Sequence, residues 1–180
     1  MAEIESIDSV VAYQNKWMTV REHRIRRPSG AEGIFGVVEK PNCVVLLPID
    51  RGEIHLVEQY RFPVGARFWE APQGAWEERP DAPIEALAAG ELREETGLVS
   101  HRLRCLGQVH LVPGYSNQAC WVFLASELES AGETRLDQEE EGLISRAFPV
   151  ETFEAMIASG EVKDSTTLCA YGLAKAKGAL

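Results

Sequence analysis

The sequence predicts an α/β protein that begins with a layer of antiparallel strands, and three observations support this. Apolar and polar residues alternate well through residues 4–27, as they do in strands with one covered face. Residues 43–48 form an apolar run, which is typical of a strand buried on both faces. Residues 84–96 are mostly helix formers, and two more helices are predicted near the end of the chain.

The strands of the first third are separated by clear turn signals. Arg26-Arg27-Pro28-Ser29-Gly30 is a predicted turn, because Pro and Gly interrupt regular structure, and Asp50-Arg51-Gly52 is typical of a β-hairpin. The strands expected around these turns cover residues 9–13, 18–25, 34–38, 43–48 and 54–60.

The central helix is predicted over residues 84–96. Pro83 suits the first turn, where its missing N–H has no partner to lose, and Gly97 suits a left-handed helix end. After it we expect strands at residues 103–111, 120–125 and 143–149, with an acidic loop at residues 126–142. A helix over residues 150–159 precedes a last helix that is capped by residues 164–167 and runs through Lys177.

Composition bounds the class of protein. With 180 residues, 45% of them apolar and 26% charged, the chain suits one domain with a full core. A net charge of −10 argues against a nucleic-acid surface, and no apolar run approaches the ~18 residues of a membrane span. The start resembles no signal peptide, and the four cysteines lack C-x-x-C spacing, so we expect a cytoplasmic protein with reduced thiols.

Three carboxylates of the central helix point to a metal site. At about 100° per residue, Glu91, Glu94 and Glu95 fall within a narrow arc of the helix surface. Like charges at this spacing destabilise a helix by a few tenths of a kcal/mol, and a divalent cation removes that repulsion. Such hard oxygen ligands suit Mg²⁺ or Mn²⁺, whereas the alternative is a solvated acidic face.

The segment around this helix resembles the signature box of the Nudix hydrolases, G-x5-E-x7-R-E-U-x-E-E-x-G-U, where U is aliphatic. The second half of the box is matched by Glu91, Leu92, Glu94, Glu95, Gly97 and Leu98. In the first half, Gly74 lies two residues upstream of strict register, and Ala82 stands at the early glutamate, which Glu77 or Glu78 could replace. Gly90 stands where the family has an arginine that orients the glutamate matching Glu94. Restoring that arginine should be tolerated unless the helix packs closely against another element there.

A narrower resemblance comes from the strand and loop before the box. Gln59-Tyr60-Arg61 followed by Trp69-Glu70-Ala71-Pro72-Gln73-Gly74 is similar to the ADP-ribose pyrophosphatase branch of the family. That resemblance implies that Arg61 contacts the substrate, that Glu70 lies in the pocket and that the carbonyl of Gln73 binds metal. It also implies that Pro113 shapes the pocket.

Arg61 and Trp17 each have two interpretations. Arg61 could form a surface ion pair with Glu58, although an arginine fork suits a diphosphate. Trp17 could stack on a nucleobase or pack in a core or interface.

The resemblance implies an α/β/α sandwich with a mixed sheet. Residues 1–40 would form an N-terminal strand layer that joins a homodimer, and residues 41–180 the hydrolase domain. The implied activity is Mg²⁺-dependent, or Mn²⁺-dependent, hydrolysis of a nucleotide sugar, with ADP-ribose giving AMP and ribose 5-phosphate. The alternatives are GDP-mannose, a broad range of nucleotide sugars, or a non-catalytic nucleotide sensor.

The general base is expected outside the helix. A carboxylate engaged with metal is a poor base, because the cation holds its lone pairs and lowers its pKa. In the branch that this chain resembles, the base is a glutamate of a loop between the last two strands. Its counterpart here would be Glu139, Glu140 or Glu141, and the sequence does not select one of them.

Overall fold

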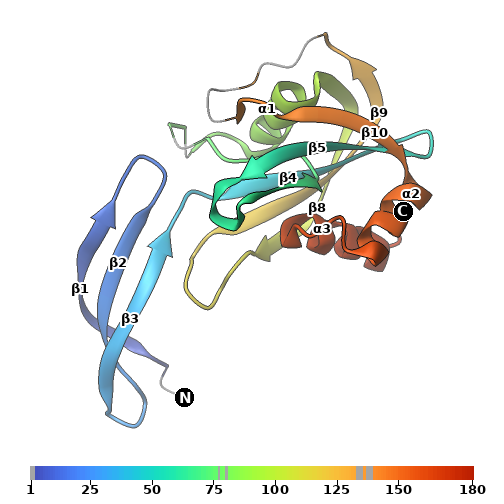
Figure 1. Cartoon of the computed structure of the whole chain (residues 1–180). Helices are drawn as coiled ribbons and strands as arrows, with labels where there is room; N and C mark the ends of the chain where they lie inside the picture. Colours follow the sequence, from blue (N-terminus) through green and yellow to red (C-terminus); the bar gives the residue numbers. More distant parts are fainter. Residues whose placement is uncertain (1–2, 77, 80, 133–135, 137–139) are drawn as a thin grey trace.

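The strands form two separate sheets in the part of the chain that the structure describes. The computed structural model describes residues 3–76, 78–79, 81–132, 136 and 140–180. The N-terminal sheet has the order β1-β2-β3 and is antiparallel throughout. It stands to one side of the remaining chain (Figure 1) and consists of β1 (Glu5–Gln14), β2 (Thr19–Arg26) and β3 (Glu32–Glu39).

The second sheet is mixed and has seven strands. Its main path is β10-β5-β4-β9-β8, with β6 paired to β5 and β7 to β4. The β4–β9 pair is parallel, whereas the other described pairs are antiparallel. These strands are β4 (Cys43–Asp50), β5 (Glu53–Arg61), β6 (Ala66–Glu70), β7 (Gln73–Gly74), β8 (Leu98–His110), β9 (Ala119–Ser130) and β10 (Ile144–Pro149).

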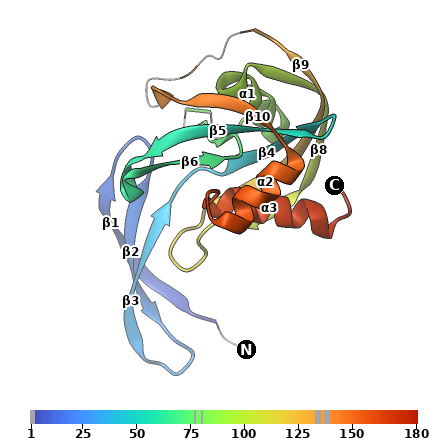
Figure 2. The same cartoon turned by 45° about the vertical axis from the view of Figure 1, so that its right-hand side comes forward.

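Helices cover both faces of this mixed sheet. Helix α1 (Ile84–Thr96) lies on one face, and α2 (Val150–Ser159) and α3 (Ser165–Ala176) lie together on the other (Figure 2). A short 3₁₀ turn, η1 (Phe62–Val64), joins β5 to β6. The predicted α/β/α sandwich is therefore confirmed. None of the described helices has the length and apolarity that a membrane crossing requires.

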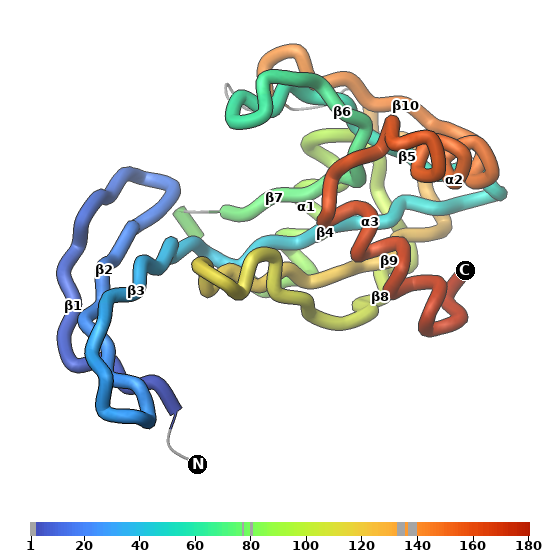
Figure 3. The backbone as a smooth tube through the Cα atoms, turned by 60° about the horizontal axis from the view of Figure 1, so that its bottom comes forward, coloured from blue at the N-terminus to red at the C-terminus, as the bar shows by residue number. Residues whose placement is uncertain are grey.

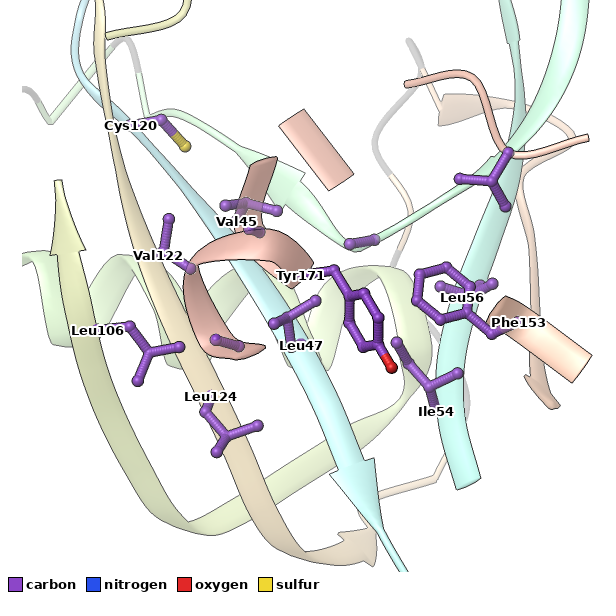
Figure 4. Close-up of a cluster of buried hydrophobic side chains, with 14 of the residues drawn as sticks. Val45, Leu47, Ile54, Leu56, Leu106, Cys120, Val122, Leu124, Phe153 and Tyr171 are labelled. Atoms are coloured by element: carbon purple, nitrogen blue, oxygen red, sulfur yellow. The ribbon is translucent and has the colours of Figure 1, made fainter. Parts of the chain in front are cut away.

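Strand β4 organises the core because its side chains alternate between the two helical layers. Val45 and Leu47 belong to the cluster that α2 and α3 complete with Phe153 and Tyr171 (Figure 4). The neighbours Val44 and Leu46 belong to a second cluster, which α1 completes with Leu87, Ala88 and Leu92. All of residues 43–48 are buried, as the apolar run predicted.

Helix ends and turns follow the sequence signals. Gly97 adopts φ 69° and ψ 16°, and its N–H donates to the Arg93 carbonyl at 3.0 Å, which ends α1 in the expected left-handed cap. Pro83 precedes the first helical residue. The hairpin at Asp50-Arg51-Gly52 has positive φ at its two central residues, 50° and 81°, as a tight hairpin turn requires.

Three strands of the mixed sheet differ from the prediction beyond their outer ends: β6 and β7 were not predicted, and β8 begins at residue 98 rather than 103. The partner of this early part of β8 was also missed. Residues 126–130 were expected in a loop, but they continue β9 and pair with residues 98–102 of β8. Their polar composition misled the prediction because this end of the β8–β9 hairpin extends past the core. Glu127, Glu129 and Ser130 are exposed there and are hydrated while the backbone remains in the ladder.

Candidate metal and diphosphate site

Three carboxylates from two distant segments converge beside helix α1. Glu91 and Glu95 lie one turn apart on α1, and Glu140 comes from the segment that precedes β10. One carboxylate oxygen of each lies within 4.8 Å of the others. Glu91 is 5% exposed and Glu95 is 1% exposed, so neither belongs to a solvated acidic face.

The electrostatics of this group suit a cation. Burial raises the pKa of Glu95 well above its usual value, and the nearby Glu91, Glu140 and Glu70 raise it further. A divalent cation would reverse this balance by neutralising the buried charges. All three donors are carboxylate oxygens, which fit Mg²⁺ or Mn²⁺.

Strand β7 brings the backbone close to these carboxylates. A Cβ atom on Gly74 would lie less than 3.0 Å from the Glu91 carboxylate, so a larger residue there would require that side chain to move. The N–H of Gln73 donates to Oε2 of Glu95 at 3.2 Å. The backbone of Gln73 thus contacts the carboxylate group, and its carbonyl stays a predicted metal ligand. Gly74 therefore serves the site although it lies upstream of strict box register.

Arg61 and the buried Glu70 form a fork at the ends of β5 and β6. Arg61 donates through Nε at 3.2 Å and through Nη2 at 2.5 Å to the two oxygens of Glu70. Burial raises the pKa of Glu70, and the Arg61 guanidinium opposes that rise. The alternative pairing of Arg61 with Glu58 is wrong, because Glu58 accepts from Arg67 at 3.0 Å.

A cavity of about 260 Å³ opens beside this fork. Arg61, Gln73 and Gly74 line it, so it is adjacent to the carboxylates that Gln73 and Gly74 contact. Lys40 lines it as well, and the sequence analysis missed this residue. Lys40 follows β3 in the link between the two sheets, and no local motif marks it as part of a site.

The other predicted residues lie around the carboxylate group rather than in it. Glu94 is half-buried and is not among the three carboxylates that meet. Glu141 is exposed, whereas Glu139 and Glu77 lie outside the described residues; Glu78 is exposed. Pro113 is exposed in the turn between β8 and β9, whose flanking residues Leu111 and Gln118 line the cavity.

Trp17 lies in the turn between β1 and β2, next to a second cavity of about 280 Å³. Its side chain is 41% exposed, and the Lys16 ammonium lies 4.4 Å from the ring centroid. Lys40 lines this cavity too and so connects it with the one beside Arg61. Trp17 is not part of the core, and its stacking role stays a prediction.

The N-terminal sheet and most of the rest of the chain match two different family models. Residues 39–168 match the NUDIX domain, and residues 4–38 match the nucleoside diphosphate sugar hydrolase N-terminal domain. The chain belongs to the Nudix family.

Similar Nudix proteins come from two bacteria. An ADP-ribose pyrophosphatase of Mycobacterium tuberculosis (strain ATCC 25618 / H37Rv) is 29% identical over 167 residues, which cover 92% of this chain and 80% of that protein. An ADP-ribose pyrophosphatase of Bacillus subtilis (strain 168) is 28% identical over 179 residues, covering 99% of this chain and 96% of that protein. A crystal structure of an ADP compounds hydrolase superposes with a TM-score of 0.84 at 17% identity, over 100% of this chain and 98% of that one.

The structure explains why this Nudix box departs from the family pattern at Gly90. Trp76 occupies the space beside it, and a Cβ atom on Gly90 would lie less than 3.0 Å from the indole ring. The guanidinium of Arg79 stacks on the same indole ring, with its central carbon 3.6 Å from the ring centroid. Of the two outcomes expected for an arginine at Gly90, the structure favours the second, because α1 packs closely against Trp76.

Proposed function

We propose that this Nudix protein hydrolyses the diphosphate of a nucleoside diphosphate sugar, and that its preferred substrate is ADP-ribose. The products would be AMP and ribose 5-phosphate. The observation that carries the proposal is the group of Glu91, Glu95 and Glu140 next to a cavity lined by Arg61 and Lys40. Two relatives named as ADP-ribose pyrophosphatases over most of the chain support the choice of sugar nucleotide.

The cavity residues suit a diphosphate. A guanidinium has five N–H donors, and the fork to Glu70 uses two of them, so Arg61 keeps donors for phosphate oxygens. The buried Glu70 also fixes the direction of the guanidinium. Lys40 adds a second positive charge in the same cavity. Together they hold an anion within a chain of net charge −10.

The carboxylate group would hold Mg²⁺, or Mn²⁺, through Glu91 and Glu95. When bound, such an ion neutralises phosphate oxygens and lowers the pKa of a coordinated water. Glu140 is our candidate for the general base, because it is the described loop glutamate that reaches the carboxylate group. In this proposal Glu91 and Glu95, rather than Glu140, hold the ion. Glu140 would take a proton from the attacking water. At the same time, the water oxygen would bond to phosphorus and the bridging P–O bond would break.

The substrate proposal is tested with a panel of ADP-ribose, GDP-mannose, UDP-glucose, NADH and dinucleoside polyphosphates, each with Mg²⁺. We expect the highest kcat/KM with ADP-ribose. A higher kcat/KM with GDP-mannose would identify that compound as the substrate. Similar kcat/KM values for all the compounds would indicate a broad-range hydrolase. Binding of ADP-ribose without turnover of any compound would indicate a nucleotide sensor instead.

The general base is tested by single replacements of the loop glutamates. Glu140→Gln should lower kcat by about two orders of magnitude with little change in KM, as the loss of a general base does. Glu141→Gln is the matched control, since its exposed side chain is the same size and should keep normal kcat. Normal kcat in Glu140→Gln together with a loss in Glu139→Gln would move the base to Glu139.

We also propose a homodimer in the cytoplasm. The N-terminal sheet has large apolar side chains in water, among them Val10, Tyr13 and Ile34 at 62%, 55% and 68% exposure. A second copy of the sheet would cover them. All four cysteines are free, which suits a reducing compartment.

A further inference from the structure

The first turn of α3 is tied to the loop that forms the site. Asp164, the N-cap residue, accepts three hydrogen bonds on Oδ2. Two are those of an ordinary cap, from the N–H and the hydroxyl of Thr167, both at 2.7 Å. The third comes from Nε2 of Gln73 at 3.0 Å, across 91 positions of the sequence.

Thr167 makes a second link to the same loop. Its side chain is fully buried, at 0% exposure. While its hydroxyl donates to Asp164, the same oxygen accepts from the backbone N–H of Ala71 at 2.8 Å. The start of α3 therefore holds the segment 70–74 at two points, the backbone of Ala71 and the side chain of Gln73.

That segment carries much of the proposed site. Glu70 forms the fork with Arg61, and the Gln73 N–H donates to Glu95 at 3.2 Å. Gly74 makes room for the Glu91 carboxylate. Hydrogen bonds thus connect Asp164 to the side-chain amide of Gln73, and the backbone N–H of Gln73 to the buried Glu95 of the carboxylate group.

We propose that Asp164 and Thr167 are positioning residues of the site: they fix segment 70–74 so that Glu95 and Glu70 keep the geometry that metal and diphosphate need. This inference rests on the proposed function. Partners that orient metal ligands typically change metal affinity or activity by about 10- to 100-fold when they are removed. Neither residue lines the cavity or belongs to the carboxylate group.

The competing explanation is that these bonds only dock α3 on the sheet. A second anchor of α3 allows the two roles to be separated. The hydroxyl of Tyr171 donates to Glu154 of α2 at 2.7 Å, and Lys175 pairs with the same carboxylate at 2.8 Å. This anchor also holds α3, but it joins α3 to α2 and includes no residue of segment 70–74.

The test compares Thr167→Val, which keeps shape but loses the hydroxyl, with Thr167→Ser, which keeps the hydroxyl. Tyr171→Phe is the control for docking alone. For each variant, Mg²⁺ affinity is measured by calorimetry without substrate, together with Tm, kcat and KM. We expect Thr167→Val to weaken Mg²⁺ binding and lower kcat by about tenfold or more. Thr167→Ser should remain near the unmodified enzyme, and Tyr171→Phe should lower Tm alone.

A second variant covers the case in which Thr167→Val does not fold. Gln73→Met removes only the side-chain amide that reaches Asp164 and leaves the N–H to Glu95 in place. It should give the same loss of Mg²⁺ affinity and kcat. The inference is overturned if both variants keep Mg²⁺ affinity and kcat, or if Tyr171→Phe reduces them equally. The substrate panel on the unmodified enzyme tests the proposed function separately, so the two failures are distinguishable.

Discussion

At the scale of single residues, burial and the neighbouring carboxylates both disfavour the ionised form of Glu95. The side chain is 1% exposed, and burial together with Glu91, Glu140 and Glu70 raises its pKa well above the usual value. Glu95→Gln keeps the shape and removes one buried charge. At 100 times its dissociation constant, Mg²⁺ should stabilise the unmodified protein by about 2.7 kcal/mol. The variant should show little of this gain and lose most activity, as thermal unfolding with and without Mg²⁺ would measure.

Glu94→Gln is the matched control on the same helix. Glu94 is half-buried and lies outside the group that Glu91, Glu95 and Glu140 form, so its loss should leave most of the Mg²⁺ stabilisation. An equal Mg²⁺-dependent rise in Tm for Glu95→Gln and the unmodified protein would rule out Glu95 as a ligand. Loss of that rise in Glu94→Gln instead would return Glu94 to the metal group.

Spacing along one helix was enough to predict that Glu91 and Glu95 share a face, because α-helical geometry fixes this. The same spacing also included Glu94, which lies outside the carboxylate group. Glu140 could only be narrowed to three neighbours, since loop geometry depends on tertiary contacts. Lys40 and the Asp164–Gln73 hydrogen bond could not be predicted, because each joins segments that lie far apart in the sequence. Asp164 was recognised as a helix cap, and its second role appears only when α3 lies on the sheet.

At the scale of elements, helix α1 depends on the contact between Gly90 and Trp76. Alanine at Gly90 would gain about 1 kcal/mol of helix propensity. Its Cβ atom would however overlap the indole ring, and overpacking of this kind costs about 1–3 kcal/mol. We expect Gly90→Ala to lower the free energy of unfolding, measured with urea. In a Trp76→Ala background the same change should be neutral or stabilising, and equal losses in both backgrounds would contradict this packing.

Strands and helices were predicted well where burial follows the local pattern. Residues 43–48 were placed correctly because the run is apolar on both faces, and α1 because Pro83 and Gly97 bracket it. The outer part of β9 was missed because its side chains are hydrated while its backbone pairs with β8. Periodicity reports which side chains are buried, and a ladder that extends past the core leaves no such signal.

At the scale of the whole molecule, the N-terminal sheet lies to one side of the sandwich (Figure 3) and is joined to it through Val38 of β3, whose backbone is hydrogen-bonded to Tyr115 and Asn117 in the turn between β8 and β9. The register of its strands places Val10, Tyr13 and Ile34 on one face, since Ile34 lies opposite Arg24 and Val10 opposite Glu22 on β2. These three side chains are more than half exposed. An exposed apolar face of this kind is typical of a site where a partner surface binds.

A homodimer would supply that surface, so light scattering should give a particle of twice the 19.9 kDa chain mass at micromolar concentration. Ile34→Glu places a charge in the proposed interface, at a side chain that is 68% exposed in the single chain. It should therefore dissociate the dimer without unfolding the sandwich. Leu180→Glu, at the far end of the chain from this sheet, is the matched control and should remain dimeric (Figure 1). A particle of single-chain mass for the unmodified protein would exclude the dimer, and a dimeric Ile34→Glu would place its interface on another surface.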